Sequence, residues 1–229
     1  NPDKATNLFK DSQKIITKVF FIYIFLTGLI FILLSLAGIR LFNSFNLAMS
    51  VSSTGAFIPT NELSEIIRST SQKIILTIGV TFSALNIYFF YSLFKNSNTN
   101  KKHQEDFLIL LAITFFSLIL FFSIKETSIL SIFFNVVSSM SNSGLTFNDP
   151  PENFYLFFVL ITIIGGSVLS NSSGIKFLRL YILFKSTVIE IFKLVSPNVI
   201  IDHRILKTDN KINNENLNSS FFIFICFFI

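Results

Sequence analysis

The sequence predicts an all-α membrane protein built from repeated membrane-pore-membrane units. Hydrophobic residues make up 51% of the 229-residue chain, which contains 31 phenylalanines and has a mean hydropathy of +0.65. Soluble globular domains reach such an apolar share only at the upper end of their range. In addition, several apolar runs approach the length of a bilayer crossing, and Ser, Asn and Gly segments interrupt the chain between and within them.

Four apolar runs are candidate membrane spans, at residues 15–39, 74–94, 107–124 and 154–169. A helix needs about 20 mostly apolar residues to cross a bilayer, and the last run is short, as expected for a helix broken inside the membrane. Two shorter stretches, 41–52 and 128–139, have about a dozen residues each, which suits re-entrant half-helices rather than full crossings.

The distribution of charge predicts the orientation in the membrane. Lys and Arg gather before the first span, at 95–102 and between 176 and 211, whereas the loops 59–71 and 149–152 are mainly acidic. Because cytoplasmic loops carry an excess of basic residues, the first set is expected inside and the second outside. The net charge of +5 is attributed to this orientation, and no nucleic-acid partner is expected.

The two halves of the chain resemble two copies of one unit: span, half-helix, polar loop, span. An offset of 89 residues aligns Phe45 with Phe134, Gly55 with Gly144, and three further identical pairs. Internal repeats are common in transport proteins. This alignment predicts that Gly55 and Gly144 occupy equivalent positions.

These patterns predict five segments. They are 1–95 for one repeat with a cytoplasmic N-terminal segment, 96–106 for a cytoplasmic linker, 107–195 for a repeat with a broken second helix, 196–216 for a cytoplasmic loop, and 217–229 for the start of another repeat. The chain has no initiator methionine and ends within an apolar run, so we expect a fragment of a longer protein.

Two polar segments are candidate cation-binding loops. They contain Ser53, Thr54, Gly55 and Ala56 in one repeat, and Asn142, Ser143, Gly144 and Leu145 in the other. A dehydrated cation needs oxygen atoms in place of its hydration shell, and rings of backbone carbonyls supply them. Gly permits the unusual dihedral angles that such a loop requires, and each half-helix directs its negative dipole end toward the loop. These residue types also form ordinary turns, but their repetition favours cation binding.

A third polar segment interrupts the last candidate span. It contains Gly165, Gly166, Ser167, Ser170, Asn171, Ser172, Ser173 and Gly174, and the basic residues Lys176 and Arg179 follow. Non-helical backbone persists inside a bilayer only where protein or water satisfies it, so we predict a gating loop. A simple kink at a Gly pair is the alternative, against which the many polar groups argue. Lys176 and Arg179 either bind the loop or an acidic group, or mark the cytoplasmic boundary.

The remaining reactive side chains do not predict a catalytic or metal site, because His103, His203 and Cys226 are dispersed along the chain. An integral membrane enzyme acting on lipid would need a convergent catalytic set. A purely structural membrane subunit would leave the repeated polar breaks without a role. We therefore predict a chain that is not an enzyme, and keep these two classes as alternatives.

The polar loops resemble those of the bacterial Trk/Ktr potassium transporter family, particularly its Trk-type membrane subunit. The resemblance rests on AMSVSSTGAF, SSMSNSGLTF and IGGSVLSNSSGIKFLR, and it continues in LVSPNVIIDHRI and NLNSSFFIF. It covers essentially the whole chain, as the second and third of four repeats and the beginning of the fourth.

This resemblance implies a potassium-channel-like fold and multi-pass insertion in the bacterial inner membrane. It implies potassium uptake through a carbonyl-lined filter, without a cofactor in this chain. A homodimer surrounded by membrane lipid and a cytoplasmic nucleotide-binding regulatory subunit are implied as partners, whereas co-transport of a proton or sodium ion stays open. The family usually has Gly where this chain has Ala56, so either Gly55 takes that role or this quarter of the filter is altered.

Overall fold

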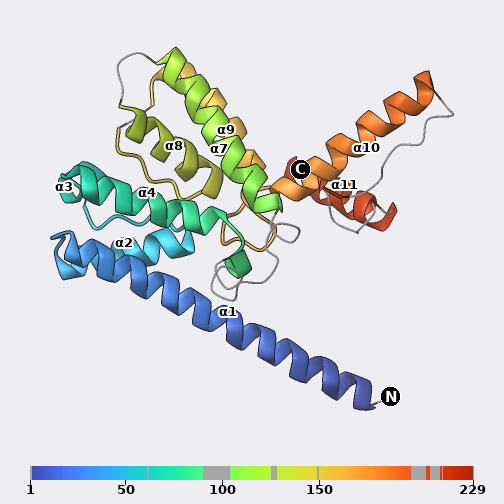
Figure 1. Cartoon of the computed structure of the whole chain (residues 1–229), viewed down its shortest axis with the longest axis horizontal. Helices are drawn as coiled ribbons and strands as arrows, with labels where there is room; N and C mark the ends of the chain where they lie inside the picture. Colours follow the sequence, from blue (N-terminus) through green and yellow to red (C-terminus); the bar gives the residue numbers. More distant parts are fainter. Residues whose placement is uncertain are drawn as a thin grey trace.

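The computed structural model is helical, and the residues it describes contain no strand (Figure 1). These residues are 2–60, 62–89, 104–124, 128–148, 150–196, 205–206, 212 and 214–228, without the side chains of 2–12, 14, 214 and 228. The helices are α1 (Pro2–Leu36), α2 (Leu41–Ser53), α3 (Leu63–Ile66), α4 (Thr70–Ala84), α7 (Gln104–Ser123), α8 (Ile129–Ser141), η1 (Glu152–Phe154), α9 (Tyr155–Ile164), α10 (Phe177–Val195) and α11 (Asn214–Phe228). The predicted all-α fold class is confirmed.

The first unit consists of α1, α2 and α4, which contact one another in pairs. Its apolar core includes Leu34, Leu47 and Leu76, all of them fully buried. The start of α4 is fixed by a capping box between Ser69 and Gln72. The Gln72 side chain also donates to the carbonyl of Ala37 at 2.9 Å, which ties α4 to the turn between α1 and α2.

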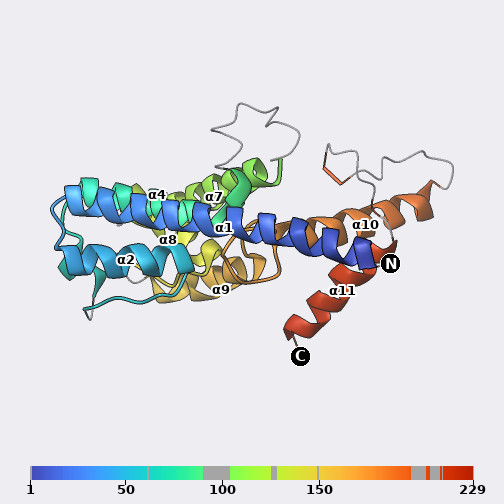
Figure 2. The same cartoon turned by 90° about the horizontal axis from the view of Figure 1, so that it is seen from below.

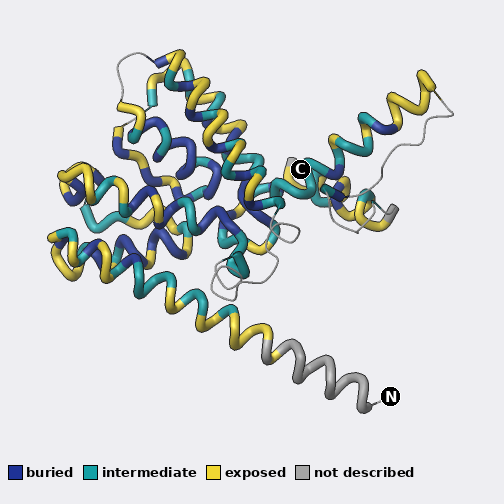
Figure 3. The backbone as a smooth tube through the Cα atoms, in the orientation of Figure 1, coloured by how far each residue is buried: buried dark blue, intermediate teal, exposed yellow. Residues whose placement is uncertain are grey.

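The second unit repeats this arrangement with α7, α8 and α9, and α8 packs between the other two helices. Ser128 caps α8 by accepting a hydrogen bond from the backbone N–H of Ser131. In Figure 3, α8 is the most thoroughly buried helix, as its set of buried residues confirms. The half-helices expected from the sequence are therefore present in both units, as α2 and α8.

The two units meet where α4 packs against α8 (Figures 1 and 2). Phe134 of α8 is fully buried and stacks on Phe147, with 3.9 Å between the ring centroids. The ammonium of Lys73 on α4 lies 5.3 Å from the centroid of the Phe147 ring, within cation–π range. The aromatic pair therefore joins the second half-helix and its loop to the first unit.

One predicted span ends earlier than expected, and another breaks where the sequence predicts. The run at 74–94 forms α4 only as far as Ala84, because Leu85 is extended and the Asn86 backbone N–H donates to the Asp106 carboxylate at 2.9 Å. The run at 154–169 leaves the helix after Ile164. In the described part of the chain, two helical segments are long and apolar enough to cross a membrane, Ile15–Leu36 and Gln104–Ser123.

The C-terminal part extends away from the two units, and α10 packs against α11 (Figures 1 and 2). Most of the predicted linker at 96–106 lies outside the described residues, as does much of the predicted loop at 196–216. His103 and His203 lie there too. Cys226 is an exposed free thiol on α11.

Replacement of Phe134 tests the contact between the units. We expect Phe134→Ala to lower the free energy of unfolding by about 3–5 kcal/mol, because it deletes a buried ring and leaves a cavity. Phe122→Ala on α7 is the matched control, since that ring is 77% exposed. Denaturant titration of the purified full-length protein in detergent measures both. An equal loss in the two variants would contradict the assignment of Phe134 as a core residue.

Candidate functional site

The loop after each half-helix begins with the same backbone conformation. Thr54 and Asn142 adopt left-handed dihedral angles, with φ of 54° and 58°. Two residues later, Ala56 and Gly144 again have positive φ, at 54° and 65°. Residues that alternate in the sign of φ allow successive carbonyl groups to point to the same side of a chain. Both loops therefore have a backbone suited to presenting carbonyl oxygens to a cation.

The structure corrects the predicted register between the repeats, because the equivalent residues are 88 rather than 89 positions apart. The helices Leu41–Ser53 and Ile129–Ser141 coincide at this offset. The loop bonds agree, since the Gly55 N–H donates to Ser50 O at 2.9 Å and the Ser143 N–H to Ser138 O at 3.0 Å. Ala56, and not Gly55, is thus the counterpart of Gly144.

Burial shows why the alignment on identical residues was wrong. It paired Phe45 with Phe134, but Phe45 is 52% exposed whereas Phe134 is fully buried. This identical pair therefore faces different surroundings in the two half-helices. The backbone of Gly55 lies outside the left-handed region, so the alternative in which Gly55 takes the role of the missing Gly is also wrong.

The two loops approach each other at Ala56 and Gly144. A Cβ added to Gly144 would lie 2.9 Å from the Cβ of Ala56, which is closer than such atoms normally approach. Ser143 and Leu145 on either side of Gly144 are fully buried, while Gly144 itself is exposed. A cavity of about 370 Å³ opens beside Gly144, and the carboxyl-bearing Glu62 is among the residues that line it.

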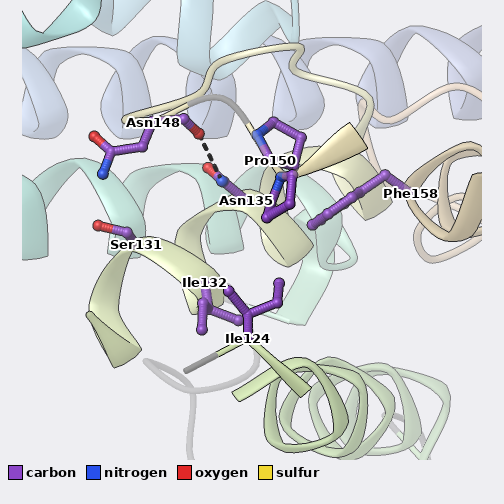
Figure 4. A pocket seen from close by; sticks show the side chains of 8 residues that line it. Ile124, Ser131, Ile132, Asn135, Asn148, Pro150 and Phe158 are labelled. Carbon is purple, nitrogen blue, oxygen red and sulfur yellow. Dashed lines mark hydrogen bonds between the residues drawn. The ribbon is translucent and has the colours of Figure 1, made fainter. Parts of the chain in front are cut away.

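A hydrogen bond from α8 to the end of the second loop supports this loop (Figure 4). The Asn135 side-chain amide donates to the carbonyl of Asn148 at 3.0 Å, which ties α8 to the end of the loop. The Asn135 Oδ1 atom is buried, and no described protein atom donates to it. It adjoins a small cavity between Ser131 and Phe158 that has room for about one water molecule.

The predicted gating segment leaves the helix and returns to its starting point. The Ile175 N–H donates to Ile163 O at 2.9 Å and the Phe177 N–H to Gly166 O at 3.0 Å, which closes the base of the excursion between α9 and α10. Gly165 has φ of 66°, and a Cβ there would lie 2.4 Å from Ser173 O. The glycines at this base are therefore required by close backbone contacts, and a simple helix kink does not describe the segment.

Three other elements hold the excursion in place. Ser167 N–H donates to Ala84 O at the end of α4 (3.0 Å), and Val168 N–H donates to the Glu105 carboxylate at the start of α7 (3.0 Å). The third contact is at the end of the first half-helix, where the Asn171 amide donates to Ser52 O at 2.6 Å. Thr54 Oγ1 in turn donates to Asn171 O at 3.3 Å. The segment is thus bonded directly to the start of a candidate cation-binding loop.

The structure assigns one of the roles left open for the basic residues to Lys176. Lys176 folds back over its own segment, and its ammonium donates to the carbonyl oxygens of Ser170, at 3.2 Å, and Ser172. Arg179 lies in the first turn of α10, where its backbone N–H donates to Lys176 O at 3.0 Å. Lys176 therefore binds the interrupted segment.

Sequence reasoning did not identify Glu105 and Asp106 as site residues. Their carboxylates accept backbone N–H groups from Val168 and Asn86, at the two points where helices break. Acidic residues are common in the first turn of any helix, which conceals this role. An adjacent acidic pair directly before a long apolar run was the one signal that could have indicated it.

Two known proteins, one similar in sequence and one similar in fold, are transporters. No protein-family model matches the chain. An uncharacterised cation transporter of Methanocaldococcus jannaschii is 26% identical over 222 residues, covering 93% of this chain and 44% of the relative. The crystal structure of the potassium transporter TrkH from Vibrio parahaemolyticus matches 93% of this chain and 48% of its own, at 19% identity and a TM-score of 0.78.

The chain thus spans about half the length of both proteins. The structural match confirms the predicted fold. Both matched proteins are transporters, in agreement with the prediction that the chain is not an enzyme.

Replacement of Gly165 tests the base of the excursion. We expect Gly165→Ala to destabilise the protein by about 1–3 kcal/mol, because alanine is strained at this dihedral angle and its Cβ meets the Ser173 carbonyl. Gly28→Ala on α1 is the control, since a Cβ there has no atom within 4 Å. Thermal unfolding in detergent compares the two variants. A Gly165→Ala protein as stable as the control would contradict the observed closure.

Proposed function

We propose that this chain forms part of a potassium uptake pathway across a bacterial inner membrane. The observation that carries the proposal is the pair of abutting loops, each placed at the C-terminal end of a half-helix and each alternating in the sign of φ. The similarity to a cation transporter and to a potassium transporter supports the proposal. An interior-negative potential favours inward movement by about 2.3 kcal/mol per 100 mV for each positive charge.

The proposed filter consists of backbone carbonyls from residues 53–56 and 142–145. Its centre is expected at Ala56 and Gly144, where the loops meet and the backbone is left-handed. The C-terminal ends of α2 and α8 contribute negative dipole ends nearby. Glu62 beside Gly144 adds a negative charge to the adjoining cavity, which raises the local concentration of cations.

The excursion at 165–176 is proposed to be the gate, because it is bonded to the end of α2 and to the start of the first loop. The rest of the pathway would come from the repeats that this chain does not include. A homodimer in membrane lipid and a cytoplasmic nucleotide-binding regulatory subunit are proposed from the resemblance to the Trk/Ktr family. Potassium is the proposed substrate, and no cofactor is required.

A matched pair of glycine substitutions tests the filter. We expect Gly144→Ala to reduce the preference for potassium over sodium, because a left-handed alanine costs about 1–2 kcal/mol, a factor of about 5–30 in an equilibrium. Gly55→Ala should keep the preference, because Gly55 lies outside the left-handed region and its added Cβ meets only the Ser53 hydroxyl. Uptake of rubidium and sodium by potassium-uptake-deficient cells measures both. A loss of preference in Gly55→Ala but not in Gly144→Ala would support the alignment that pairs Gly55 with Gly144. Unchanged selectivity in both variants would contradict the filter assignment.

Asn171 provides the corresponding test of the gate. We expect Asn171→Ala to raise rubidium flux about two- to tenfold without changing selectivity, since the lost hydrogen bond contributes about 0.5–1.5 kcal/mol to the closed state. Asn153→Ala in η1 is the control, because that asparagine is exposed. A change in ion preference at constant flux would assign Asn171 to the filter instead.

A further inference from the structure

The ammonium of Lys176 lies among four oxygen atoms of its own segment. Its Nζ atom is 3.2 Å from both the carbonyl and the hydroxyl oxygen of Ser170, and 3.4 Å from the hydroxyl of Ser172, whose carbonyl it also contacts. An ammonium has three protons to donate. The ammonium can therefore donate a proton to only three of the four oxygens, whereas a spherical cation could contact all four. These four oxygens of Ser170 and Ser172 are called the cage.

The hydroxyl groups of the cage are oriented as acceptors. Ser170 Oγ donates its proton to Ser167 O at 2.6 Å, and Ser172 Oγ accepts the Gly166 N–H at 2.9 Å. The two hydroxyl oxygens are 2.7 Å apart, so Ser172 donates to Ser170 once the proton of Ser170 is used. Lone pairs are thus left facing the ammonium, and oxygen lone pairs are also what replaces the hydration shell of a monovalent cation.

The position of Lys176 is not one that helix formation favours. It is the residue before α10, where the positive end of the helix dipole repels a cation. Its φ of 29° also lies outside the regions that an L-residue normally occupies. Strained residues of this kind often mark functional sites. The cage thus holds the ammonium in place despite the repulsion by the helix dipole and the strained backbone of Lys176.

We propose that the oxygens of Ser170 and Ser172 form a monovalent-cation site in the interrupted segment, and that Lys176 occupies it as a tethered competitor of the transported ion. Ser170 and Ser172 flank Asn171, which is bonded to Ser52 at the end of α2. Arrival of a cation in the cage would release the ammonium. The choice of a monovalent cation rests on the proposed transport function.

Competition can be measured on the unaltered full-length protein in detergent. Acylation of lysines by an amine-reactive ester is followed by mass spectrometry, in potassium chloride or in choline chloride of equal ionic strength. At a potassium concentration about ten times the dissociation constant of potassium for the cage without its ammonium, mass action predicts about a tenfold faster acylation of Lys176. Lys193 on α10 is the control, because its ammonium pairs with Glu190 at 3.3 Å and is remote from the cage in sequence. Equal rates for Lys176 in the two salts would overturn the proposal.

Direct binding provides the second readout. Lys176→Met removes the competitor while keeping an unbranched side chain, so the variant should bind an additional rubidium ion per chain in equilibrium dialysis. Lys176→Arg keeps the charge and should not gain this ion, and adding Ser170→Ala and Ser172→Ala to the Met variant should weaken it. A folded Met variant with unchanged rubidium binding would contradict the site, and if that variant does not fold, the acylation result decides.

The two proposals fail in different ways. A potassium-dependent acylation of Lys176 together with normal selectivity of Gly144→Ala would retain the cage and reject the filter. If Gly144→Ala reduces the preference for potassium but acylation of Lys176 does not depend on potassium, the cage alone is rejected. Lys176 would then be a structural tether.

Discussion

The arrangement depends on one constraint: peptide groups removed from water need partners within the protein. The excursion at 165–176 satisfies this requirement with neighbouring segments. Ile163 and Gly166 accept bonds from the far side of the excursion, so that α9 and α10 meet at a closed base. Ala84, Glu105 and Ser52, which lie on three other elements, accept further hydrogen bonds from the excursion. The interrupted segment is thus stable only inside the complete packing of both units.

The same packing imposes the left-handed backbone at Ala56, a conformation that normally disfavours alanine. The Ser50 hydroxyl accepts the Phe57 N–H at 2.7 Å and stabilises the turn directly after Ala56. In the second loop, the stacked pair of Phe134 and Phe147 and the bond from Asn135 to Asn148 provide the support. The two loops therefore share a backbone shape although different side chains maintain it.

These contacts connect the candidate filter to the candidate gate by short paths. Asn171 bonds to the last turn of α2 and to Thr54, while Ser170 and Ser172 beside it hold the ammonium of Lys176. Movement of the lysine would therefore displace the residues that position the first loop. A cation-sensitive contact at this place would couple the state of the gate to the ion that passes it.

Hydropathy and polar interruptions were sufficient to predict the helical membrane class, the two half-helices and the break after Ile164, because these features follow from local composition and length. The register of the repeats was not predictable from identical residues. Ala56 has the left-handed backbone because it follows the end of α2 by the same number of residues as Gly144 follows the end of α8. The end of α4 at Ala84 and the roles of Glu105 and Asp106 likewise depend on bonds between segments distant in sequence, whereas Lys176 bonds within its own segment. Sequence patterns report the burial of a segment, whereas only the folded chain determines which carbonyl and which donor meet.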